Sequence, residues 1–131
     1  MLFKFLRNVA CHHPIKGEEL ICVQFANYMR EMTLTSRCSH VWFHVSNEGN
    51  SAAKQLWGSR QRNMGKFAGV ADYIFLGKHS NLALEIKNGK KPLQESQKDF
   101  KSWCEINNVP FEKATSFNEC VDIVKLHKIV V

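Results

Sequence analysis

The sequence predicts an α/β fold in which a mixed central sheet is flanked by helices. Two nearly continuous apolar runs, 72–76 and 82–87, are separated by the polar stretch 77–81, which is the pattern of a buried hairpin. Segments with helical spacing of apolar residues precede and follow this hairpin, so that helices and strands alternate along the chain. At 131 residues the chain is long enough for one domain with a real core, and we expect a single domain over residues 1–131.

The first part of the chain contains two expected helices and one strand. Residues 17–32 have apolar side chains at helical spacing, with Glu18 and Glu19 in the first turn, where the helix dipole favours acidic groups. A polar connector over 33–39 leads to a short strand at 40–45. Residues 51–64 form a second helix that ends before Gly65, and we expect Trp57 to belong to the core.

The expected hairpin brings three charged residues together. Asp72 opens the first strand and Glu85 lies near the end of the second, so the two carboxylates can meet across the pair. Because side chains alternate along a strand, Glu85 and Lys87 share one face, which we expect to be open to solvent and substrate. Leu84 and Ile86 then point into the core.

The last part of the chain supplies a helix, a strand and another helix. Pro92 is placed to begin a helix that runs to Ile106. Its buried stripe consists of Leu93, Gln97, Phe100, Trp103 and Cys104. An amide on such a stripe is costly unless something needs its hydrogen bonds, which favours a place for Gln97 near an active centre. A strand at 109–115, a helix at 117–126 and the apolar end 129–131, which either completes the core or seals a dimer, follow.

Paired carboxylates of this kind have a definite chemical use. Two carboxylates with a main-chain carbonyl between them, that of Ile86, suit a hard cation such as Mg²⁺ or Mn²⁺. The ion activates water and neutralises charge on a phosphate, and Lys87 can hold or deprotonate that water. A Glu-x-Lys strand can equally be an ordinary salt-bridged face, and the spacing alone does not decide between the two.

The distribution of charge favours a polyanionic partner. The chain contains 18 Lys and Arg against 12 Asp and Glu, a net charge of +6. Between residues 60 and 101 nine basic residues face four acidic ones, an excess of +5. The candidates for contact with nucleic-acid phosphates near the carboxylates are Arg60, Arg62, Lys66, Lys90 and Lys91.

The order Asp72, Glu85, Lys87 resembles the signature of the PD-(D/E)XK nucleases, and its surroundings resemble the VRR-NUC branch, the virus-type replication-repair nuclease domain. Further similar pieces are the acidic first helix, His44 with the turn Asn47-Glu48-Gly49, the approach 64–70 to Asp72, and Gln97. Ala71 stands where the family usually has proline, which affects the entry to the strand and removes no ligand.

This resemblance implies a restriction-endonuclease-like core and assigns roles to the residues. Asp72 and Glu85 would bind the metal, and Lys87 would be the catalytic lysine. Gln97 would support the site, and Glu19, in preference to Glu18, would be a further acidic ligand or orienter. His44 and Asn47 would lie at the DNA side of the site, although a histidine at a strand end and an Asn-Glu-Gly turn are also common structural features.

The function that we expect is a Mg²⁺- or Mn²⁺-dependent DNA endonuclease that hydrolyses phosphodiester bonds. Stand-alone members of the resembled branch act as homodimers on branched DNA, including four-way (Holliday) junctions, so the resemblance implies a resolvase active in DNA repair. The alternatives are a nucleic-acid-binding module or partner subunit without catalysis, and a nuclease that acts on RNA.

Cysteine usage and hydropathy indicate the compartment. The five cysteines are odd in number and scattered, as expected of reduced thiols in the cytoplasm. No apolar run approaches the roughly 20 residues of a membrane span, and the apolar start is too short for a signal peptide. We therefore expect a soluble cytoplasmic protein, of phage or prokaryotic origin.

Overall fold

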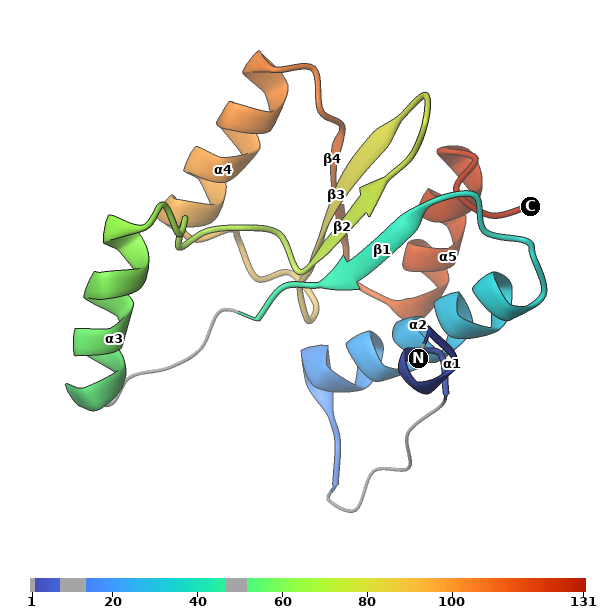
Figure 1. Cartoon of the computed structure of the whole chain (residues 1–131), viewed down its shortest axis with the longest axis horizontal. Helices are drawn as coiled ribbons and strands as arrows, with labels where there is room; N and C mark the ends of the chain where they lie inside the picture. Colours follow the sequence, from blue (N-terminus) through green and yellow to red (C-terminus); the bar gives the residue numbers. More distant parts are fainter. Residues whose placement is uncertain (1, 8–13, 47–51) are drawn as a thin grey trace.

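The computed structural model describes residues 2–7, 14–46 and 52–131. In chain order its elements are α1 (Leu2–Phe5), α2 (Gly17–Leu34), β1 (Val41–His44), α3 (Ala52–Asn63), β2 (Tyr73–Leu76), β3 (Asn81–Ile86), α4 (Glu95–Ile106), β4 (Phe111–Ala114) and α5 (Phe117–Leu126) (Figure 1). The order of helices and strands from α2 to α5 is the one that the sequence predicts.

The four strands form one mixed sheet in the order β1-β2-β3-β4. The β1/β2 and β2/β3 pairs are antiparallel, whereas β3 and β4 are parallel and are joined through α4. The expected hairpin is therefore confirmed, with Tyr73 opposite Leu84. Strand β3 lies between β2 and β4, and every residue from Leu82 to Ile86 is buried, which confirms its central place.

Helices α2 and α5 cover one face of the sheet and enclose the larger part of the core. Phe25 of α2 packs edge-on against Tyr73 and Phe75 of β2, with ring centroids 5.1 and 6.1 Å apart. All three side chains are at most 1% exposed. The Tyr73 hydroxyl donates a hydrogen bond to the Cys22 carbonyl at 3.0 Å, which satisfies the one polar group in this aromatic cluster.

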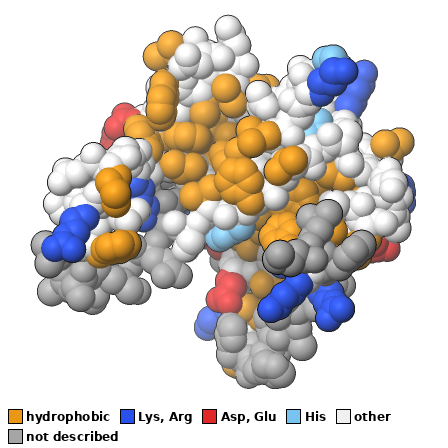
Figure 2. Space-filling view, viewed as in Figure 1, with side chains coloured by type: hydrophobic (Ala, Val, Ile, Leu, Met, Phe, Trp, Pro, Cys, Tyr) orange, Lys and Arg blue, Asp and Glu red, His pale blue; other side chains and the backbone are white. Residues whose placement is uncertain are grey.

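Helix α4 covers only part of the opposite face. A smaller cluster of Ala71, Ala83, Phe100 and Cys104 lies between α4 and the sheet. In Figure 1 α4 stands to one side of the strands, and in Figure 2 hydrophobic side chains are exposed over the middle of this face. The sheet thus has one face under two helices and one face that is partly open.

Three sequence-based expectations about the helices were wrong. Helix α4 begins at Glu95 and not at Pro92, because Gln94 caps it in a capping box with Gln97. Trp57 and Trp103 were expected in the core, yet they are 58% and 55% exposed. Helix α3, which contains Trp57, stands apart from the sheet (Figure 1), and Trp103 lies on the outer margin of the apolar stripe of α4.

The apolar end of the chain completes the core. Ile129 and Val130 are 1% and 4% exposed, and Val130 forms an isolated antiparallel bridge with Cys38. Ile129 and Val130 thus complete the core, one of the two roles considered for this segment, whereas Val131 is 83% exposed and the sealing of a dimer stays a prediction. The described cysteines, Cys22, Cys38, Cys104 and Cys120, are free thiols. Among the described helices, none is both long and apolar enough to cross a membrane.

Candidate functional site

Asp72 and Glu85 meet at one end of the sheet. Asp72 lies immediately before β2 and Glu85 is the penultimate residue of β3. The backbone N–H of Ile86 donates a hydrogen bond to Asp72 Oδ2 at 2.7 Å, which fixes the Asp72 side chain against β3. The two carboxyl groups are close enough that each shifts the pKa of the other. The meeting expected from the hairpin is therefore confirmed.

Glu85 and Lys87 are not open to solvent as expected. Their side chains share the face of the sheet on which α4 lies, and they are 3% and 7% exposed. The first turn of α4 reaches Glu85, because Gln97 Nε2 donates a hydrogen bond to Glu85 Oε1 at 3.0 Å. Leu84 and Ile86 point to the other face and are fully buried in the larger core, as expected.

Gln97 joins the helix to the site. Its Oε1 accepts a hydrogen bond from the Gln94 backbone N–H at 2.8 Å, and its Nε2 donates to Glu85. The amide is half-buried, so the expectation of a buried polar group on the inner stripe holds only in part. Both ends of the amide are nevertheless used, which ties the position of Glu85 to the start of α4.

The segment before Asp72 makes a close backbone contact with the first turn of α4. Gly69 is buried, and a Cβ atom added there would clash with the carbonyl oxygen of Ser96 in the first turn of α4. Only glycine therefore allows the segment before Asp72 to approach the helix so closely.

The pKa values of both carboxyl groups are raised. Burial first, and then the Asp72 carboxylate, raise the pKa of Glu85 to about 8, while the charge of Lys87 lowers it. Burial also raises the pKa of Asp72, against the opposing effect of the Ile86 N–H. Two acids with raised pKa values in contact require either a shared proton or a cation.

One oxygen of this pair has no partner. Glu85 Oε2 is buried and accepts no hydrogen bond from any described residue. A buried carboxylate oxygen without a donor is costly, and a neighbouring carboxylate cannot donate unless it is protonated. The donor set fits a hard divalent cation, which Asp72 and Glu85 would hold together with the main-chain carbonyl of Ile86.

The acidic residue that helix α2 contributes to this end of the sheet is Glu18. Its Oε1 accepts a hydrogen bond from the Asn88 N–H at 3.2 Å, and its charge raises the pKa of both Asp72 and Glu85. Glu19, which we favoured from the sequence, is exposed and lines a separate pocket of about 490 Å³. A role for Glu19 in the site stays a prediction.

His44 also lines that pocket, and it lies near enough to Asp72 to affect its pKa. Its ring packs edge-on against Tyr73 with centroids 5.0 Å apart, and its charge lowers the pKa of Asp72. The other residues that line the pocket are Glu19, Cys22, Val23, Ala26 and Arg30. His44 is exposed, so its imidazole is accessible from solvent.

The expected cationic residues lie on exposed segments before β2 and after β3. Arg60 and Arg62 lie in the last turn of α3, and Lys66 follows that helix. Lys90 and Lys91 lie in the turn after β3. Asn47 lies outside the described residues.

Lys113 is a cation that the sequence did not bring to attention. In the register of the parallel β3/β4 pair, Lys113 lies opposite Glu85. Its Nζ donates a hydrogen bond to the Lys91 carbonyl at 3.2 Å. This register depends on the connection through α4, so no local sequence pattern shows that Lys113 lies opposite Glu85.

Neither clustered metal ligands nor similarity to known proteins adds a further assignment. In the part of the chain that the structure describes, no three His, Cys, Asp or Glu side chains are grouped to hold a metal. Comparisons with protein-family models, with curated proteins and with solved structures found no match to this chain.

Proposed function

We propose that this chain is a Mg²⁺- or Mn²⁺-dependent DNA endonuclease with a restriction-endonuclease-like core of the VRR-NUC type. The observation that supports this most strongly is the buried, partnerless Glu85 Oε2 beside Asp72. A structural salt bridge would leave no such oxygen, because its partners would be satisfied by each other. The pair therefore suits a cation that arrives from outside the chain.

Each residue of the proposed site has a distinct role. Asp72 and Glu85 hold the metal, which when bound supplies an activated water and offsets charge on the scissile phosphate. The buried Lys87 ammonium stabilises negative charge close to Glu85 and orients the attacking water. Gln97 positions Glu85, and the exposed cations Arg60, Arg62 and Lys90 attract the DNA backbone.

Branched DNA, and four-way junctions in particular, is the substrate class that we propose. The support is the resemblance of the motifs together with the spread of cations over two separate segments, α3 and the turn after β3. Cations on separate segments can contact more than one duplex arm, whereas a linear duplex needs only one track of phosphate contacts.

The deciding experiment is cleavage of a labelled four-way junction, with linear duplex, single-stranded DNA and a matched RNA as controls. Each is incubated with Mg²⁺, Mn²⁺ or EDTA, using the wild type, Asp72→Ala and Glu85→Ala. We expect metal-dependent cutting of the junction that both substitutions abolish, while DNA binding is unchanged or tighter because repulsion toward phosphate is removed.

Other outcomes would change the proposal in defined ways. Equal cutting of linear DNA would keep the nuclease and discard the junction preference, and preferential cutting of RNA would replace the substrate class. Binding of the junction without cutting in either metal would support a nucleic-acid-binding module. Loss of binding and cutting together in Glu85→Ala would contradict the roles given to the carboxylates.

A further inference from the structure

Helix α3 presents a tryptophan to solvent. Trp57 is 58% exposed, and its indole makes no aromatic contact with any residue that the structure describes. The helix packs closely against none of the other described helices and strands, and it stands apart from the sheet in Figure 1. The exposure of Trp57 is therefore not explained by the packing of the chain itself.

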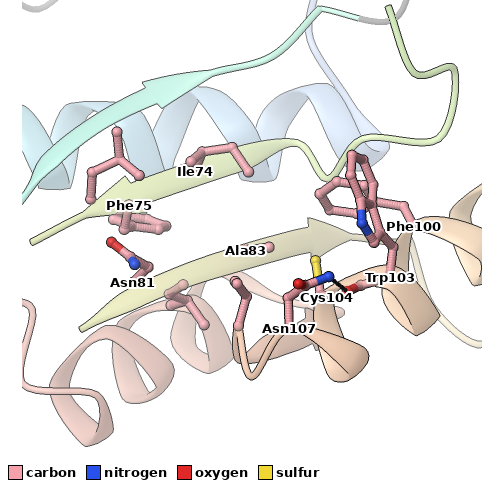
Figure 3. A pocket seen from close by; sticks show the side chains of 11 residues that line it. Ile74, Phe75, Asn81, Ala83, Phe100, Trp103, Cys104 and Asn107 are labelled. Carbon is pink, nitrogen blue, oxygen red and sulfur yellow. Dashed lines mark hydrogen bonds between the residues drawn. The ribbon is translucent and has the colours of Figure 1, made fainter. Parts of the chain in front are cut away.

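The other exposed tryptophan differs from Trp57 in this respect. The ring of Trp103 packs against Phe67, with centroids 5.5 Å apart. Together with Phe100 it lines a groove of about 330 Å³ between α4 and the sheet (Figure 3). None of the described residues that line this groove is charged. Trp103 thus belongs to an apolar surface, whereas Trp57 lies among charged residues.

The surroundings of Trp57 are basic. Residues 52–66 contain four cations and no acid: Lys54, Arg60, Arg62 and Lys66. Arg60 follows Trp57 by three positions and is its neighbour on the helix surface. Arg62 Nη1 lies 3.6 Å from the point where a Cβ atom of Gly58 would stand, so this guanidinium reaches back toward the residue beside Trp57. An aromatic ring beside cations suits a nucleotide, because the ring stacks on the base and the cations bind phosphates.

Backbone hydrogen bonds fix the direction of α3 relative to the segment that follows it. The Lys66 N–H donates to the Gln61 carbonyl at 3.0 Å, and the Gly65 N–H donates to the Arg62 carbonyl at 3.0 Å. These two bonds form a Schellman motif, and Gly65 supplies its left-handed residue with a φ of +102°. The helix therefore ends in a defined turn.

The segment after this turn is anchored on α4. The Phe67 ring packs against Phe100 with centroids 5.8 Å apart, and Gly69 lies close to the Ser96 backbone. Phe67 precedes Asp72 by only five positions. The base of α3 is therefore fixed close in the chain to the proposed site, and Trp57 lies on the helix that extends from it.

We propose that Trp57 stacks on a nucleobase left without a stacking neighbour at the branch of the DNA, and so favours branched over linear DNA. Inside a linear duplex both faces of each base are covered by the adjacent pairs, so the indole finds no free face. An unpaired or splayed base offers one. The inference rests on the proposed function, because it names the feature of the DNA substrate that α3 recognises.

Binding in EDTA tests this stacking without any cleavage. A fluorescein-labelled four-way junction and a linear duplex with the sequence of two of its arms are titrated with wild type, Trp57→Ala, Trp57→Leu and Trp57→Phe. We expect Trp57→Ala and Trp57→Leu to weaken junction binding by about 5–150-fold, the range for one lost stack. Trp57→Phe keeps a ring and should keep most of the affinity. Binding of the linear duplex, which depends on cations, should be unchanged in all three variants.

The control is Leu126→Ala, which removes an equally exposed apolar side chain from α5. Leu126 is 74% exposed, and both affinities should equal those of the wild type. Tryptophan emission gives a second readout, because stacking on a base quenches an indole. The junction should quench the wild type but not Trp57→Phe, in which Trp42 and Trp103 remain. Far-UV circular dichroism confirms that each variant is folded.

Three results would overturn the inference. Junction binding that is unchanged in Trp57→Ala would leave α3 to a different partner. Equal losses for junction and linear duplex would mean that the indole contacts the duplex and not a free base. Wild-type junction affinity in Trp57→Leu would mean that the ring is not needed. A junction bound through Trp57 but never cut would contradict only the proposed function, whereas unchanged binding and cutting in Trp57→Ala would contradict only this inference.

Discussion

Gln97 is the residue on which the geometry of the site depends most directly. Its amide caps α4 through Gln94 and holds Glu85 through Nε2. A glutamate in its place keeps an acceptor for the cap, and an acid is favoured in the first turn of a helix. It cannot donate to Glu85, however, and it adds a third negative charge beside the two carboxylates. Gln97→Glu therefore keeps the acceptor for the helix cap and removes the donor that positions Glu85.

We expect Gln97→Glu to keep the helix cap but to lower kcat by about 10–100-fold, with a smaller change in KM for DNA. Steady-state cleavage at saturating Mg²⁺ measures both constants, with Glu95→Gln on the same turn of α4 as the control. Wild-type kcat in Gln97→Glu would show that the contact with Glu85 has no role in the reaction.

Glu85 should make the stability of the metal-free protein depend on pH. In the fold its pKa is raised to about 8, from an ordinary value of 4.5, by burial and by Asp72. The folded protein therefore holds a proton that the unfolded chain releases above pH 4.5. The cost of ionising the buried acid is absent below that pH, and it grows as the pH rises from about 4.5 to about 8.

We therefore expect the melting temperature in EDTA to fall as the pH rises through this range, and the fall to be reduced in Glu85→Gln. Addition of Mg²⁺ should reverse the loss most strongly at the alkaline end, because the ion replaces the proton. Glu31→Gln on the exposed side of α2 is the control. Equal slopes of melting temperature against pH in Glu85→Gln and in the wild type would contradict the assignment.

At the scale of elements, the contact between Gly69 and the first turn of α4 sets the distance between helix and sheet. A Cβ atom at position 69 would meet the Ser96 carbonyl, and backbone cannot move aside as a side chain can. We expect Gly69→Ala to cost about 1–3 kcal/mol of unfolding free energy and to lower cleavage, because α4 moves away together with Gln97. Urea unfolding and cleavage rates test this.

Gly58→Ala is the matched substitution. Gly58 lies in α3, where an added Cβ meets only the end of the Arg62 side chain at 3.6 Å. Alanine is the better helix former, so Gly58→Ala should be neutral or slightly stabilising. Equal destabilisation by the two substitutions would mean that the contact of Gly69 with Ser96 is not special.

The sequence predicts the elements better than it predicts their surroundings. Strands β2 and β3 and their antiparallel pairing follow from two apolar runs and a polar turn, and the meeting of Asp72 with Glu85 follows from that pairing. The burial of Glu85 does not follow, because its contact comes from the first turn of α4, ten residues further along the chain. Alternation identifies the face of a strand but not what packs on it.

For the same reason, the sequence does not predict the exposure of two tryptophans or which acidic residue of α2 lies near the carboxylates. Trp57 and Trp103 have the size and apolar character of core residues, yet each lies on a helix surface that no other described element covers completely. Glu18 and Glu19 are equivalent as first-turn acids. Only the hydrogen bond from Asn88, 70 residues away, distinguishes Glu18, and no local pattern contains such a contact.

For the whole molecule, the two faces of the sheet separate the larger core from the proposed site. The face under α2 and α5 contains the aromatic core and the completed C-terminal segment. The face under α4 contains the smaller cluster, the carboxylates and the uncharged groove. The cations proposed to hold DNA lie on α3 and on the turn after β3.

This separation predicts which cations determine the affinity for DNA. If Arg60 and Arg62 both contact phosphates, their removal should lower the slope of log K against log salt by about 1.8, since each phosphate contact contributes about 0.9. We expect Arg60→Ala combined with Arg62→Ala to weaken junction binding in EDTA and to flatten its salt dependence by this amount. Fluorescence anisotropy over a range of NaCl concentrations measures both.

The control removes the same charge from other parts of the surface. Lys78 in the turn between β2 and β3 and Lys125 on α5 are both exposed. Lys78→Ala combined with Lys125→Ala should leave the slope nearly unchanged, because these cations lie away from α3 and from the carboxylates. If both double variants lowered the slope equally, the binding would depend on net charge alone, and α3 would have no special part in holding the DNA.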